Sequence, residues 1–160
     1  MTMTETNENP DHEKIAKAVE LTRQEKFDEA IVIFEEVLPN LTSGSIPDKR
    51  VAAGAVSYYG VCLAKVRRKY AEAVQYCNVS IKTNIFDPDH RYNLALVYLE
   101  RDDRRAAVDA LSSGLRLNPK HPRINEVFDE IGRRQKPVIP FLARNNPLNV
   151  WLGKKRRHAE

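Results

Sequence analysis

Apolar residues recur at helical spacing from Pro10 to about Arg134, and the strict alternation that is typical of strands does not occur. Pro10, Pro47, Pro88 and Pro122 stand where helices should begin, and a proline in the first helical turn loses no internal hydrogen bond. The polar first nine residues lack the pattern, and we expect a disordered leader over 1–9. The pattern predicts helices over residues 11–24, 27–39, 48–67, 70–84, 89–101, 104–117 and 122–134.

The predicted helices come in pairs that repeat. The segments KFDEAIVIFEEVLPN, KYAEAVQYCNVSIKTN and DRRAAVDALSSGLRLNP share a layout in which an alanine is followed four residues later by a core residue. These alanines, Ala30, Ala73 and Ala107, are 43 and 34 residues apart. A 34-residue period is typical of tetratricopeptide repeats, and the loop LTSGSIPDKR can absorb the nine extra residues of the first interval.

Over about three quarters of its length the chain thus resembles a tetratricopeptide-repeat protein. The third repeat matches best, at Leu94, Ala95, Tyr98, Ala107, Leu111 and Pro119. The first repeat is weaker because Lys17 replaces a large apolar residue, and the second carries one extra residue between its helices. The resemblance implies an all-α fold, a right-handed α-solenoid of three helix pairs over 10–134 with a C-terminal capping helix, followed by an extended tail over 135–160.

The first helix of each pair lines a concave binding face in this family, and the resemblance therefore implies a mostly apolar groove for a peptide or helix of a partner protein. The family's inward positions fall on Ile15, Val19, Thr22, Ser57, Val61, Tyr92, Leu96 and Leu99, with Ala64 as a further candidate. A register shifted by one residue would instead place some of these side chains in the core. The positions that form a carboxylate clamp in some relatives read Ile15, Val19, Tyr58, Asp89 and Asn93, which predicts no such clamp.

The tail holds three prolines and too many large apolar residues for a solvated coil. Three alternatives stay open: it folds back on its own domain and gates the groove, it docks on a partner or a second copy as a homodimer, or its basic end binds anionic membrane or nucleic acid. The anchors would be Phe141, Leu142 and Trp151, and the basic end is Lys154, Lys155, Arg156 and Arg157. The PVIPFL and NPLN segments resemble tails of small bacterial tetratricopeptide proteins.

Composition and motifs favour a binding protein over an enzyme. The charged fraction of 30% and hydrophobic fraction of 42% are ordinary for a soluble domain, and the net charge of +4 combines a mildly acidic body with a basic C-terminal end. Without an apolar leader or span, the expected location is the cytoplasm. Cys62 and Cys77 are expected to be buried free thiols, and neither the histidines nor the glycines form a metal, nucleophile or phosphate-loop motif. We therefore predict a non-enzymatic adaptor or scaffold without cofactor or metal.

Overall fold

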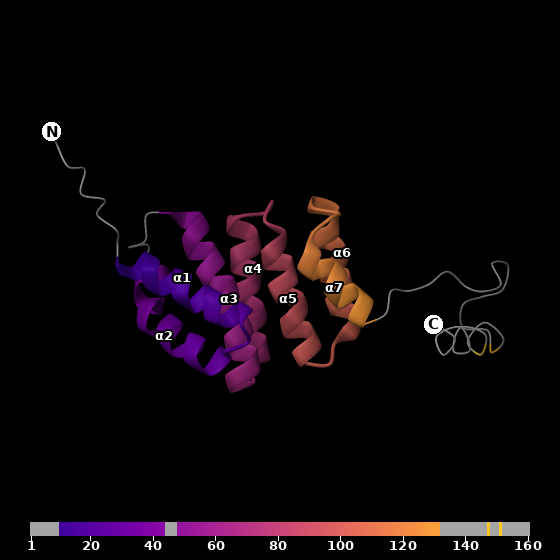
Figure 1. Cartoon of the computed structure of the whole chain (residues 1–160), viewed down its shortest axis with the longest axis horizontal. Helices are drawn as coiled ribbons and strands as arrows, with labels where there is room; N and C mark the ends of the chain where they lie inside the picture. The colour runs from indigo at the N-terminus through magenta and orange to yellow at the C-terminus, as the bar shows by residue number, and fades with distance from the viewer. Residues whose placement is uncertain (1–9, 44–47, 132–146, 148–150, 152–160) are drawn as a thin grey trace. The chain divides into compact units, whose positions relative to one another are not determined.

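The computed structural model describes residues 10–43 and 48–131 together with Pro147 and Trp151. In these residues the backbone is helical or forms turns, and strands do not occur, which confirms the all-α prediction. Two compact units divide the chain, Met1–Val127 and Phe128–Glu160. The helices, labelled in Figure 1, are α1 (Pro10–Arg23), α2 (Phe27–Ser43), α3 (Lys49–Arg67), α4 (Tyr70–Thr83), α5 (Pro88–Glu100), α6 (Arg104–Leu117) and α7 (Pro122–Glu130).

Aspartates set the start of three helices. The Asp48 carboxylate accepts hydrogen bonds from the backbone N–H groups of Arg50 and Val51, at 2.8 and 3.4 Å. Asp87 accepts from the N–H of Asp89 at 2.9 Å, and Asp103 accepts from the N–H of Ala106 at 3.1 Å. Because the first N–H groups of a helix have no partner inside it, such side chains fix where the helix begins.

Two predicted helix ends miss the observed ones by four residues, and the other helix bounds agree within one residue. The predicted end of α2 at Pro39 is wrong, since the helix continues to Ser43. Pro39 costs the helix one internal hydrogen bond. The extra turn buries Leu41, which is only 8% exposed, and this burial offsets the loss. Helix α7 ends at Glu130 instead of 134.

The helices of the first unit pack in two layers. Helices α1, α3 and α5 contact one another in succession and form the α1–α3–α5 layer. Helices α2, α4 and α6 each pack against the preceding helix of that layer, and α2 and α4 also contact the helix that follows. The helices of each predicted pair, α1 with α2, α3 with α4 and α5 with α6, therefore also contact each other in space (Figure 1).

Small residues occupy the contacts within the pairs. Ala18, Ala30, Ala73, Ala95 and Ala107 are all fully buried. At Gly60, a Cβ atom would lie 3.0 Å from the carbonyl oxygen of Ala73, so that the backbones of α3 and α4 approach closely only because glycine stands there. The predicted contact between Gly60 and Ala73 is confirmed.

The turns within the first and third pairs are built alike. Glu25 and Asp102 adopt left-handed φ angles of 60° and 62°. The residues that follow them donate equivalent hydrogen bonds, from Lys26 N to Leu21 O at 2.9 Å and from Asp103 N to Tyr98 O at 2.8 Å. The second pair has a shorter turn, in which Arg68 has a φ of 56°. The extra residue of this repeat lengthens the end of α3 instead of the turn.

The start of α7 covers the third pair through Ile124, which is fully buried. A Cβ atom at Gly114 would lie 2.5 Å from Cδ1 of Ile124, so the missing side chain of α6 makes room for this isoleucine. Val127 is buried as well, whereas Phe128 and Ile131, the other members of the stripe predicted for this helix, are half-buried. The first turns of α7 thus complete the core of the first unit.

Candidate functional site

The predicted groove residues divide into a buried set and a half-exposed set. Ile15, Thr22, Ser57 and Val61 are buried, as is the further candidate Ala64. Val19, Tyr92, Leu96 and Leu99 remain half-exposed. A binding role for all of these positions stays a prediction, but a buried side chain offers no surface to a partner, so a partner could contact only the half-exposed set.

Close packing inside the α1–α3–α5 layer explains the burial. The hydroxyl of Thr22 lies 3.2 Å from the Cys62 sulfur, and the Asn93 amide donates a 2.6 Å hydrogen bond to the Ser57 hydroxyl. These contacts join α1 to α3 and α3 to α5. Since Gly60 still faces α4 as predicted, the burial arises because neighbouring helices of one layer touch side by side, and not because the helical register is shifted.

A network of charged and aromatic side chains surrounds Asp89, the second residue of α5. Its Oδ2 atom lies 2.7 Å from Nη2 of Arg123 and 3.7 Å from Nη2 of Arg23. The Tyr58 hydroxyl donates to the same oxygen at 3.3 Å and accepts from both arginines, at 3.2 Å from Arg23 and 3.1 Å from Arg123. With His121 and Tyr92 these residues form what we call the Asp89 network, and they come from α1, α3, α5, α7 and the turn before α7.

His121 links this network to the start of α7. Its Nδ1 atom accepts a hydrogen bond from the backbone N–H of Ile124 at 3.3 Å, so that the ring nitrogen caps the helix. A nitrogen that accepts carries no proton in neutral imidazole, and therefore Nε2 carries it and donates to Oδ1 of Asp89, 2.8 Å away. The ring is 7% exposed and lies beside the ring of Tyr92, with centroids 6.3 Å apart.

The network favours ionised Asp89 and charged Arg123. Burial opposes ionisation of Asp89, but the Arg123 charge and the hydrogen bond from His121 together lower the pKa of this carboxyl below its usual range. Burial likewise opposes the charge on Arg123, but Tyr58 and Asp89 raise the pKa of that guanidinium above its usual value. Arg23 and Arg123 thus place two positive groups near the Asp89 carboxylate, and Glu126 adds a negative charge that acts on Tyr92.

The positive groups are also the more accessible ones. The side chain of Arg23 is 45% exposed and that of Asp89 only 21%, while that of Arg123 is 28% exposed. Aromatic faces orient both guanidinium groups, with Arg23 5.6 Å from the Tyr58 ring centroid and Arg123 4.8 Å from that of Tyr92. Both guanidinium groups are therefore more accessible to a ligand than the Asp89 carboxylate is.

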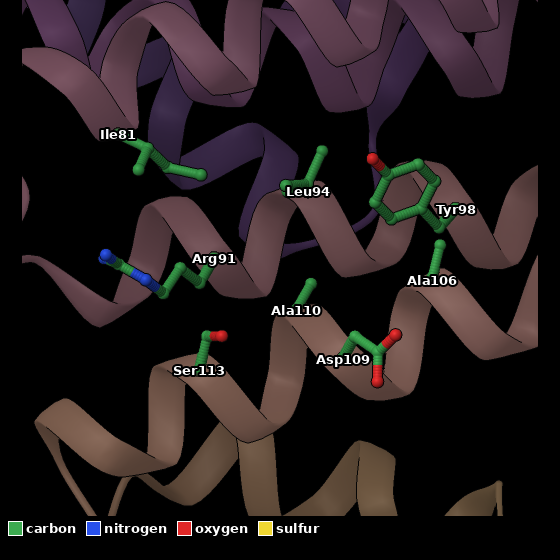
Figure 2. A pocket seen from close by; sticks show the side chains of 8 residues that line it. All are labelled: Ile81, Arg91, Leu94, Tyr98, Ala106, Asp109, Ala110 and Ser113. Carbon is green, nitrogen blue, oxygen red and sulfur yellow. The ribbon is translucent and has the colours of Figure 1, made fainter.

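A pocket of about 360 Å³ lies elsewhere on α5, between this helix and its neighbours α4 and α6. Figure 2 shows Ile81 of α4 and Ala110 of α6 on opposite sides, with Arg91 at one end and Asp109 near the other. The Arg91 guanidinium donates to the carbonyl oxygen of Ile85 at 2.7 Å. The whole lining is Ile81, Arg91, Leu94, Tyr98, Ala106, Asp109, Ala110 and Ser113.

The two cysteines are buried free thiols, as predicted. Burial raises the pKa of Cys62 to about 11 and that of Cys77 to about 12. Both therefore stay protonated near neutral pH and are poor nucleophiles and poor metal ligands. Within the part of the chain that the structure describes, histidine, cysteine and acidic residues do not gather in groups of three or more that could hold a metal ion.

The tail contributes one described anchor. Trp151 is helical and 59% exposed. Phe141 and Leu142, like the basic residues Lys154, Lys155, Arg156 and Arg157, lie outside the described residues. Among the helices that the structure describes, none combines the length and the apolar character needed to cross a bilayer.

Sequence reasoning found part of the Asp89 network. Tyr92 was predicted for the groove, and Tyr58 and Asp89 were noted as inward positions that lack clamp chemistry. Arg23, His121 and Arg123 were missed, although the residues before and inside the first turn of a predicted capping helix are a signal for contacts with the preceding repeat. No protein-family model matches the chain, and a comparison with curated proteins finds no match.

Proposed function

We propose that this protein is a non-enzymatic protein-interaction module, an adaptor or scaffold of the tetratricopeptide type, that binds a peptide or helix of a partner on the α1–α3–α5 layer. The observation that best supports this is a row of half-exposed apolar side chains on α5, formed by Tyr92, Leu96 and Leu99. Their spacing of four and three residues puts them on one face of the helix. We call these three residues the α5 row.

The α5 row has the chemistry of a helix-binding surface. Covering a fully exposed large apolar side chain gains about 1.5–3 kcal/mol, so covering three partly exposed ones gains roughly a third of that or less each. This gain is realised when a partner lays an apolar stripe along the row, as in helix-in-groove recognition. Aromatic and leucine side chains on a rigid helix also lose little conformational entropy on binding.

The repeated architecture supports the tetratricopeptide type. The helices pair in sequence and in space, the first and third turns have the same hydrogen bonds, and small residues fill the contacts within pairs. Stacked pairs of this kind build a right-handed α-solenoid whose first helices share one binding face. We assign the α1–α3–α5 layer to that face.

The α5 row can be tested by photo-crosslinking. A photoreactive phenylalanine analogue at Leu99 should capture a partner in cell extract, whereas the same group at Val79, which is 55% exposed on α4, should not. The captured protein is then identified and titrated against purified chain by calorimetry. Equal capture from both positions would count against the assignment.

Leu96→Asp provides the matched energetic test, with Val79→Asp as the control for an added charge on an exposed apolar position. We expect Leu96→Asp to weaken binding of the captured partner about tenfold or more, because it places a carboxylate in the apolar contact. Helicity and melting temperature should stay close to those of Val79→Asp. A Leu96→Asp protein that unfolds would move Leu96 into the core and sink the assignment.

A further inference from the structure

We infer that the Asp89 network reads an acidic side chain of the bound partner, with Arg23 and Arg123 as its carboxylate-binding groups. This inference rests on the proposed function, because it names the chemistry of the partner at the same surface. The occupant is an apolar peptide segment that carries an aspartate or glutamate next to its apolar stripe.

The charged groups and the α5 row are continuous through Tyr92. Tyr92 is the first member of the row, and its ring centroid lies 4.8 Å from the Arg123 guanidinium. His121 lies against the same ring. A peptide that covers Leu96 and Tyr92 therefore arrives next to a guanidinium group that is held in place by an aromatic face.

Arg23 and Arg123 each keep N–H donors that have no protein partner among the described residues. A guanidinium carries five N–H donors. In the described residues, Arg123 uses Nη2 for Tyr58 and Asp89, and Arg23 uses Nε for Tyr58. Nη2 of Arg23 lies 3.7 Å from Asp89, which is beyond hydrogen-bond distance.

The Asp89 oxygen that Arg23 faces, Oδ2, is already engaged by two other groups. Oδ1 accepts from His121, and Oδ2 accepts from Tyr58 and lies against Arg123. A second carboxylate, brought by a partner, would give Arg23 an acceptor at bonding distance. Charge-assisted bonds between guanidinium and carboxylate are the stronger class of hydrogen bond, and a lysine at the same place would be repelled.

The first experiment selects ligands without assuming a natural partner. Random twelve-residue peptides are selected on the full chain, and peptides that also bind the Leu96→Asp variant are discarded. We expect the remaining peptides to combine apolar residues with at least one aspartate or glutamate. Replacing that residue by asparagine or glutamine should weaken binding about tenfold, in the range that charged hydrogen bonds contribute.

The second experiment assigns the carboxylate to the arginines. Arg23→Gln should weaken binding of the acidic peptide about as much as the amide replacement in the peptide does. The two changes together should weaken binding little more than either one alone, because they remove the same contact. Arg104→Gln removes an equally charged, exposed side chain at the start of α6 and should leave the affinity unchanged. Circular dichroism of each variant checks that the fold is kept.

The outcomes separate the two proposals. Peptides that depend on Leu96 but show no acidic residue, or that bind Arg23→Gln as well as the native chain, would overturn the carboxylate subsite and leave the proposed function standing. Peptides that bind only with phosphoserine in place of the acid would also overturn it. A selection that yields no Leu96-dependent peptide would overturn both.

Discussion

The side-chain amide of Asn93 donates a hydrogen bond of 2.6 Å to the hydroxyl of Ser57 at the contact between α5 and α3. Both residues are completely buried. Among the residues that the structure describes, the carbonyl oxygen of the same amide finds no hydrogen-bond partner. Two helices of one layer are therefore joined by a polar contact that is only partly satisfied, and this contact fixes which residues of α3 and α5 meet.

Ser57→Ala should lower the free energy of unfolding by about 1–3 kcal/mol, because it leaves a buried amide without any partner. Urea denaturation followed by circular dichroism measures the loss. Adding Asn93→Leu to this variant should restore part of the stability, since the second change removes the unpaired group itself. An alanine variant as stable as the native chain would show that the amide finds another partner.

Alanine in place of Gly60 and alanine in place of Gly54, both in α3, should change the free energy of unfolding in opposite directions. Gly60→Ala should cost about 1–3 kcal/mol, because the new Cβ meets the Ala73 carbonyl at 3.0 Å and the Cys77 sulfur at 3.1 Å. Gly54→Ala meets no atom within 4 Å and should gain roughly 0.5–1 kcal/mol from helix propensity. Thermal unfolding of both variants checks the pair. Equal effects of the two changes would contradict the close approach of α3 and α4.

Asp89 should make folding stability depend on acidic pH. The folded-state pKa of this carboxyl lies below its ordinary value of 3.8, so ionised Asp89 stabilises the fold above that value, and the contribution is lost as pH falls through the folded-state pKa. The free energy of unfolding of the native chain should therefore exceed that of Asp89→Asn by more at about pH 6 than at about pH 3. If the difference in stability between the native chain and Asp89→Asn does not change with pH, the pKa of Asp89 is the same in the folded and the unfolded protein.

The cysteines should resist thiol reagents while the chain is folded. With pKa values of about 11 for Cys62 and about 12 for Cys77, less than about one in a hundred of these thiols is ionised near pH 8, and both are buried. Ellman's reagent should leave the native protein unmodified and should label both thiols in denaturant. Rapid labelling of the native protein would reveal frequent opening between α1, α3 and α4.

The sequence pattern was sufficient for the helices and not for the surface. Helices α1 to α7, and the pairing of α1 to α6, follow from local periodicity and from the recurrence of Ala30, Ala73 and Ala107. The burial of Ser57 and Val61 depends on how closely successive helices of one layer approach, which periodicity does not encode. Local pattern also missed the long end of α2, because the gain from burying Leu41 comes from tertiary packing.

The Asp89 network was the hardest feature to foresee. Arg23 and Arg123 are a hundred residues apart in the chain, yet both lie within 4 Å of the same carboxylate. Charged residues at helix ends usually indicate solvated positions, so their chemistry alone gives no reason to pair them. Only the side-by-side arrangement of the helices brings the two arginines and the two tyrosines together.

The four residues from His121 to Ile124 attach the start of α7 to three other helices at once, through Tyr58, Asp89 and the space at Gly114. We call these four residues the α7 clasp, because they hold the start of α7 against the α5–α6 pair. If a ligand engages Arg123, thermodynamic linkage requires that it tighten this clasp by the same free energy by which the closed clasp favours the ligand. Ligand binding would then be measurable as slower amide exchange in α6 and α7. It would also hold the start of α7 more firmly against the α5–α6 pair.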